Sequence, residues 1–312
     1  MTAAPDATPA CPVTGRPAAR FVQWVDAGFL ARLWRLQFCA NARPSFGGVK
    51  RFGLWQSPAG LYFFDPPAPG DSEFYDGFYG RLLKRGLWDK ASQRREFADA
   101  ARFVRAGDRV LDVGCGFAPF RLAVPQADYT GLDPHFARHS NDGSVRGELL
   151  AEHLKRSAGA YDVVCAFQVV EHVRDPLALF RDMVAAARPG GLVLASVPHI
   201  PSAMLRIPNF LMNAPPHHLT WWTRESLTEL ALRSGADVQS IEIVDWDASD
   251  AMIHWIERCS PIRCRDRFFS RSLLWHAATV MSFAAASLLH RVRRVPSGRD
   301  EGASLLLVAR RR

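Results

Sequence analysis

Apolar residues in the middle of the chain follow two alternating patterns. Short runs rich in aliphatic residues predict buried strands at 110–113, 129–132, 161–167 and 192–197. Between these runs, apolar residues recur every three or four positions among charged ones, which predicts amphipathic helices near 176–187 and 224–234. Weaker strands are expected near Val145 and at 238–244. Strands and helices that alternate in this way favour an α/β fold with a parallel, doubly wound sheet.

Local signals mark the ends of the predicted helices. Asp175 is a typical N-cap residue, and Pro176 after it suits the first helical position. Thr223 marks the start of the next helix in the same way, and Gly235 is a typical stop. A further helix over 90–105 is expected to lead into the first strand.

A glycine turn follows directly after the strand at 110–113. Gly114 and Gly116 have no Cβ, so the backbone can bend sharply there and a ligand can approach it closely. A dinucleotide-binding turn would have a third glycine where this chain has Pro119, which disfavours a pyrophosphate ligand. Asp112 places a carboxylate at the end of the strand, where it would repel a diphosphate and suit a positively charged ligand. The sulfonium and ammonium groups of S-adenosylmethionine carry that charge.

A second acidic residue supports this interpretation. Asp133 ends the next strand, about twenty positions after the glycine turn, where it can accept both ribose hydroxyls of an adenosyl group. With these residues the chain resembles the class I S-adenosylmethionine-dependent methyltransferases. The resemblance continues, in the order of the family, through 161–176, 187–199, 217–238 and 304–312. It implies a Rossmann-like, seven-stranded mixed sheet whose last strand is antiparallel, with S-adenosylmethionine as the cofactor.

The resemblance also implies which residues bind the methyl donor. They are Asp112, Gly114 and Gly116 at the methionine end, Asp133 at the ribose, Glu148 near the adenine amine, and Gln168 beside the pocket. Gln168 comes directly after a predicted strand, so we expect it to face the donor. Glu148 has a second interpretation, as an exposed carboxylate at the start of a helix.

Three histidines are candidates for the acceptor side of the site: His199, His217 and His218. Because a histidine titrates near neutrality, each can act as a general base toward an acceptor hydroxyl, amine or acidic carbon. The alternative is a structural role, with the ring hydrogen-bonded to backbone and packed beside tryptophans. His172 lies in the E-H-x-x-D-P motif of the family, where the histidine more often braces its loop than transfers protons.

Residues 1–88 are assigned to a leader and an accessory or lid region. The six cysteines of the chain form no C-x-x-C pair, so neither a disulfide framework nor a metal site is expected. The region resembles a degenerate zinc-ribbon preface of some bacterial methyltransferases, in which Thr14, Gln56 and Ala59 replace three of four thiols. We expect a hairpin packed on the catalytic domain. The alternative is a lid, closed over the acceptor by aromatic residues at 74–79.

The methyltransferase domain is assigned to 89–245 plus 302–312, and a basic helical insertion, 246–301, separates its two parts. The net charge of +8 comes from this end of the chain, since 251–312 holds twelve arginines and four acidic residues. A helix in the insertion is expected either to cap the active site or to lie on an anionic membrane through 267–294. No nucleic-acid-binding module is recognisable, so no nucleic-acid partner is expected.

The sequence therefore predicts an S-adenosylmethionine-dependent methyltransferase. The expected acceptor is an oxygen or carbon of a small molecule or of a lipid- or sugar-type compound, in the cytoplasm or at its membrane face. One alternative is a non-catalytic S-adenosylmethionine-binding module. Another is a dinucleotide-dependent oxidoreductase, which Pro119 and the E-H-x-x-D-P motif disfavour. The acceptor itself and the oligomeric state are not predicted.

Overall fold

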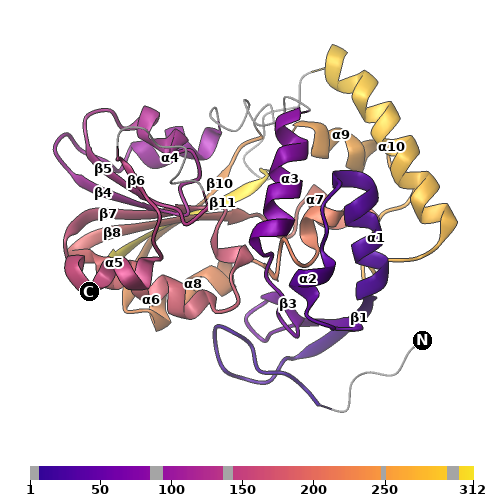
Figure 1. Cartoon of the computed structure of the whole chain (residues 1–312), viewed down its shortest axis with the longest axis horizontal. Helices are drawn as coiled ribbons and strands as arrows, with labels where there is room; N and C mark the ends of the chain where they lie inside the picture. Colours follow the sequence, from indigo (N-terminus) through magenta and orange to yellow (C-terminus); the bar gives the residue numbers. More distant parts are fainter. Residues whose placement is uncertain (1–6, 85–93, 136–142, 247–250, 294–301) are drawn as a thin grey trace.

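A computed structural model describes residues 7–84, 94–135, 143–246, 251–293 and 302–312. The larger of its two sheets has seven strands in the order β10-β11-β8-β7-β4-β5-β6 (Figure 1). These are β4 (Arg109–Val113), β5 (Asp128–Leu132), β6 (Val145–Arg146), β7 (Tyr161–Phe167), β8 (Ala187–Pro198), β10 (Ala236–Val244) and β11 (Ser304–Arg311). β11 is antiparallel to β8 and β10, and the other neighbouring strands are parallel. The predicted Rossmann-like mixed sheet is confirmed.

Each face of this sheet carries its own apolar layer, because successive residues of a strand point to opposite faces. On β4, Val110 packs in one cluster with Phe120, and its neighbour Leu111 packs in another with Phe180 and Leu230. The helices of this domain are α4 (Arg95–Ala101), α5 (Leu150–Ser157), α6 (Pro176–Ala186) and α8 (Arg224–Arg233), with short 3₁₀ turns at Pro119–Ala123 and Val170–His172. The two layers fix the carboxyl end of β4, where the glycine turn lies.

The predicted helix starts at Asp175 and Thr223 are confirmed. The Asp175 carboxylate accepts the Ala178 N–H at 2.9 Å, and Thr223 and Ser226 form a reciprocal capping box. Of the helix expected over 90–105, residues 90–93 lie outside the described part. Its described portion ends at Ala101, where the next N–H groups turn back by three residues rather than four.

The smaller sheet combines the N-terminal region with a distant segment. Its strands are β1 (Arg20–Asp26), β2 (Arg51–Gln56), β3 (Tyr62–Asp65) and β9 (Thr220–Trp221), all antiparallel to their neighbours. The helices α1 (Ala27–Phe38), α2 (Arg43–Phe46) and α3 (Ser72–Lys84) belong to the same region. A buried aromatic core joins these parts, with Trp34, Phe64 and Trp221 among its members. The accessory layer is therefore built together with residues that precede α8.

The C-terminal insertion adds a short helix, and a long one that lies at the outer edge of the molecule (Figure 1). They are α9 (Ala251–Cys259) and α10 (Leu273–Val292), and α9 packs on α7 (Ala203–Arg206). The 20 residues of α10 are long and apolar enough to cross a membrane, with a mean hydropathy of 1.3 and 17% of the helical window buried. Only a stripe of small residues, Ala278, Ser282 and Ala286, is buried on it.

Candidate methyl-donor and acceptor site

The glycine turn after β4 needs glycine for two physical reasons. Gly114 and Gly116 have φ angles of +70° and +57°, in the left-handed region that residues with a side chain rarely adopt. A Cβ at Gly114 would also lie 2.6 Å from Cγ2 of Val169, whereas a Cβ at Gly116 would meet no atom within 4 Å. The turn therefore presses against the Gln168–His172 segment on one side and leaves open space at Gly116.

Two carboxylates flank this turn. The buried Asp112 accepts a hydrogen bond from the Tyr129 hydroxyl at 2.7 Å, and Asp133 accepts the N–H groups of Gly116 at 3.0 Å and His135 at 2.8 Å. Burial raises the pKa of the Asp112 carboxyl to about 7, and the charge of Asp133 acts in the same direction. A cation beside Asp112 would stabilise its carboxylate form against both the burial and the charge of Asp133. The two acidic residues therefore fit a donor that carries sulfonium and ammonium groups, with its ribose at Asp133.

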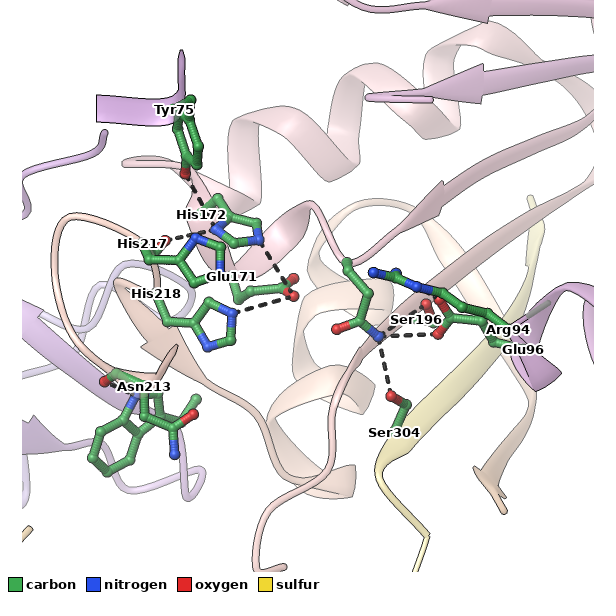
Figure 2. Close-up of polar contacts among 12 residues, drawn as sticks. Tyr75, Arg94, Glu96, Glu171, His172, Ser196, Asn213, His217, His218 and Ser304 are labelled. Atoms are coloured by element: carbon green, nitrogen blue, oxygen red, sulfur yellow. Dashed lines mark hydrogen bonds and ion pairs between the residues drawn. The ribbon is translucent and has the colours of Figure 1, made fainter. Parts of the chain in front are cut away.

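Gln168 lies at the end of β7 in a strained conformation, with a φ of +57°. Its side-chain amide donates to the Glu96 carboxylate at 3.0 Å and to the Ser304 hydroxyl at 3.1 Å (Figure 2). Glu96 in turn pairs with Arg94 at 3.1 Å. Gln168 thus follows β7 as expected, and its contact with the donor stays a prediction. The sequence analysis missed its partner Glu96, because Glu96 reads as an ordinary charge in the first turn of a helix.

Glu148 is engaged with α5. Its carboxylate accepts from Arg156 and lies 2.8 Å from Nδ1 of His153. The other ring nitrogen of His153, Nε2, lies 2.6 Å from the Tyr161 hydroxyl. The hydrogen bond from Arg156 lowers the pKa of Glu148 to about 2, and the contact with His153 adds to it. These contacts account for the charge of Glu148 within the protein, and its contact with the adenine amine stays a prediction.

Three histidines lie together, and two of them, His172 and His218, face the buried Glu171 carboxylate (Figure 2). Ring centroids lie 4.4 Å apart for His172 and His217, 4.9 Å for His172 and His218, and 4.6 Å for His217 and His218. Oε1 of Glu171, which has no exposed surface, lies 3.7 Å from Nε2 of His172 and 4.0 Å from Nε2 of His218. Tyr75 of α3 reaches the group, with its hydroxyl 3.4 Å from Nδ1 of His172.

Burial sets the protonation of this group. It lowers the pKa of His172 to about 4, and the charge of Arg94 acts in the same direction. Burial also holds the pKa values of His217 and His218 well below the usual range, and the His172 imidazole adds to this effect on both. Burial also raises the pKa of the Glu171 carboxyl to about 8. The three imidazoles are therefore neutral at pH 7 and offer lone pairs.

The third predicted histidine lies elsewhere. His199 follows β8, and its ring Nδ1 faces the Gly302 carbonyl at 3.2 Å. Its backbone N–H donates to the Ala303 carbonyl at 2.8 Å. These bonds tie the end of β8 to the segment before β11. The structure thus joins His217 and His218 to His172 and leaves His199 outside this group.

A model of the family of methyltransferase domains matches residues 81–241, more than half of the chain. The chain belongs to this family. It is a class I S-adenosylmethionine-dependent methyltransferase, with S-adenosylmethionine as its methyl donor. The glycine turn and the two flanking carboxylates stay the predicted donor-binding residues.

Individual relatives resemble parts of this methyltransferase. The ubiquinone biosynthesis O-methyltransferase of Vibrio parahaemolyticus is 34% identical over 102 residues, which is 29% of this chain and 43% of the relative. The protein of the same name from Bordetella avium is 39% identical over 102 residues, or 29% and 42% of the two chains. The chain thus spans less than half the length of these curated relatives.

A solved structure from Thermotoga maritima, described as a possible histamine N-methyltransferase, is 14% identical to this methyltransferase. The superposition has a TM-score of 0.47 and covers 77% of this chain and 98% of the other.

Proposed function

We propose that this methyltransferase transfers a methyl group to an oxygen or carbon of a small-molecule or lipid- or sugar-type acceptor, which binds at His172, His217 and His218. The observation that carries the proposal is the contact between the two halves of the site. Val169 packs against Gly114 in the donor turn, and His172 follows only three residues later in the same segment. An acceptor held by the histidines would lie beside the donor.

The chemistry of methyl transfer fits this arrangement. The acceptor atom gives an electron pair to the methyl carbon while the carbon–sulfur bond breaks and its electron pair stays on sulfur. Holding the two reactants in line contributes up to about 7–11 kcal/mol. The acceptor's proton goes to a neutral imidazole. His217 and His218 are both neutral and buried, so either can accept this proton, although the imidazolium that forms then lies in an apolar environment.

The walls of the acceptor side favour a compound with an apolar part. The ring of Phe78 lies 4.8 Å from that of His217, and Tyr75 lies 6.1 Å from the same ring, both from α3 of the accessory layer. The curated relatives named for ubiquinone biosynthesis support an oxygen as the acceptor atom. The accessory layer would thus serve as the acceptor-side wall that the lid hypothesis describes.

The outward face of α10 supports contact with an anionic membrane on the cytoplasmic side. Large apolar residues on it are exposed, among them Leu273, Leu274, Met281 and Leu288, and arginines stand at both ends. Within the proposed surface 267–294 the described arginines are Arg267, Arg271, Arg291 and Arg293, and Arg294 lies outside the described residues. A helix with this distribution can bury its apolar face among acyl chains while the arginines contact anionic headgroups.

Vesicle binding tests the membrane proposal. The protein should cosediment with phosphatidylglycerol vesicles at low salt and be released at high salt. Met281→Glu should weaken binding to the vesicles. Leu122→Glu, at an exposed apolar position in the 3₁₀ turn Pro119–Ala123 of the methyltransferase domain, should leave binding unchanged. Absence of binding at low salt would contradict the proposal.

Transfer of labelled methyl from S-adenosylmethionine to a panel of phenols, lipid-linked sugars and small metabolites tests the function itself. His218→Gln should lower turnover by about 10²–10⁴-fold with donor affinity unchanged. Donor binding without turnover on any class of acceptor would favour the non-catalytic alternative.

A further inference from the structure

The buried group around Glu171 contains polar atoms that the protein leaves without partners. Both carboxylate oxygens of Glu171, Nδ1 of His217 and Nδ1 of His218 find no hydrogen-bond partner among the described residues. Each such atom costs about 1–3 kcal/mol when it is removed from water and left unpaired. Oε1 of Glu171, which faces Nε2 of His172 and Nε2 of His218, points to a ligand between the carboxylate and these two rings.

The tautomer of His172 indicates what kind of ligand this is. Its Nδ1 lies 2.6 Å from the His217 carbonyl oxygen, which can only accept, so Nδ1 carries the proton and donates it. Nε2 of His172 therefore has a free lone pair, and it faces the Glu171 carboxylate. A backbone carbonyl that fixes one ring nitrogen is the usual way in which proteins orient a metal-binding histidine.

The distances fit a shared cation better than direct hydrogen bonds. The separations of 3.7 Å and 4.0 Å between Glu171 and the two histidine nitrogens are too long for hydrogen bonds. Ligands at about 2.0–2.2 Å from one zinc ion lie about 3.3–3.5 Å apart at the tetrahedral angle. One ligand nitrogen from each of the three histidines lies within 4.8 Å of the others. Movements of less than about 1 Å would bring the atoms to these bond lengths.

We propose that His172, His217, His218 and Glu171 bind one divalent transition-metal ion of the kind that imidazole and carboxylate ligands favour, such as Zn²⁺. The sequence analysis expected no metal because it looked for cysteine pairs, and His172 lies far from His217 and His218 along the chain. The site is distinct from the degenerate cysteine positions of the N-terminal region.

A catalytic role for the ion rests on the proposed function. With the ion bound, the lone pairs of His217 and His218 are engaged, and the ion takes the place of the imidazole base described above. An acceptor hydroxyl bound to the cation would lose its proton to water, because the positive charge lowers the hydroxyl's pKa. The oxygen then gives an electron pair to the methyl carbon, the carbon–sulfur bond breaks, and its electron pair stays on the sulfur of a neutral thioether. An oxygen acceptor is thereby favoured over a carbon one.

Zinc titration of the chelator-treated full chain by calorimetry, with no acceptor present, tests the site. The wild type should bind one equivalent, and His172→Gln and His218→Gln should each lower the affinity by more than about 100-fold. His199→Gln is the matched control, since it removes a buried histidine outside the group and should leave zinc affinity unchanged. Titration with S-adenosylmethionine shows that each variant is folded.

Cobalt substitution gives a second measurement on the wild type. Co²⁺ held by the four side chains should give the intense visible absorption of a low-coordinate ion, and excess Zn²⁺ should remove it. A folded wild type without zinc binding, or the same affinity in His172→Gln and His218→Gln, would overturn the proposal. Zinc binding without methyl transfer would leave the metal site standing and count only against the proposed function.

Discussion

The two glycines of the donor turn provide a matched pair of substitutions. Both have positive φ angles, so an alanine at either position pays about 1–2 kcal/mol of backbone strain. Only at Gly114 does the added Cβ meet a neighbour, at 2.6 Å from Val169. Val169 lies between Gln168 and His172, so it cannot move without displacing these residues. Overpacking against it therefore adds about 1–3 kcal/mol to the loss of stability at Gly114.

Gly114→Ala should therefore lower the free energy of unfolding by about 2–5 kcal/mol, and Gly116→Ala by about 1–2 kcal/mol. Urea denaturation of the ligand-free protein measures both. Calorimetry with S-adenosylmethionine should then show weaker donor binding in each, because the space at Gly116 is where the donor approaches the backbone. Equal loss of stability in the two variants would refute the assignment of Val169 as the contact that makes Gly114 necessary.

Two further predictions concern charge. Burial raises the pKa of Asp112 to about 7, and its carboxylate form is the one that would attract the cationic donor. Donor affinity measured by calorimetry should therefore fall by about tenfold between pH 8 and pH 6, and Asp112→Asn should show no such dependence. Glu257 of α9 is buried, with 1% exposure, and pairs with Arg206 of α7 at 2.8 Å and with Arg263 at 3.5 Å. Glu257→Ala should therefore lower the free energy of unfolding, measured by urea denaturation, by about 1–3 kcal/mol. This is less than the loss of a fully buried pair would cost, because the arginines are partly exposed. A loss below about 0.5 kcal/mol would contradict that account.

Features set by neighbouring residues were predictable from the sequence. The apolar run of β4, the glycines after it and the N-cap at Asp175 each depend on a few adjacent positions, and the structure confirms them. Asp112 and Asp133 were found for the same reason, since each stands at the end of a short strand.

Features that depend on tertiary contacts were not predictable. Two residues, Thr220 and Trp221, are too few to show a strand pattern, yet they pair with β3 and bind the accessory layer to the rest. The apolar residues of α10 do not show which side is buried, because the buried residues are the small Ala278, Ser282 and Ala286 and the larger apolar residues stay exposed. Periodicity does not show which face finds a partner.

The acceptor group shows the same division. His217 and His218 were candidates from their residue type, whereas their contact with His172 required the loop before β9 to fold against the 3₁₀ turn after β7. That meeting joins two segments far apart in the chain, and no local pattern records it.

The most direct test of the central claim is the structure of this protein bound to S-adenosylhomocysteine, the product of the donor. The account predicts ribose hydroxyls on Asp133, the homocysteine end at Gly114 and Gly116, and a sulfur that faces the group formed by His172 and His218. An adenosyl group bound away from Asp133, or a sulfur separated from these histidines by protein chain, would contradict it.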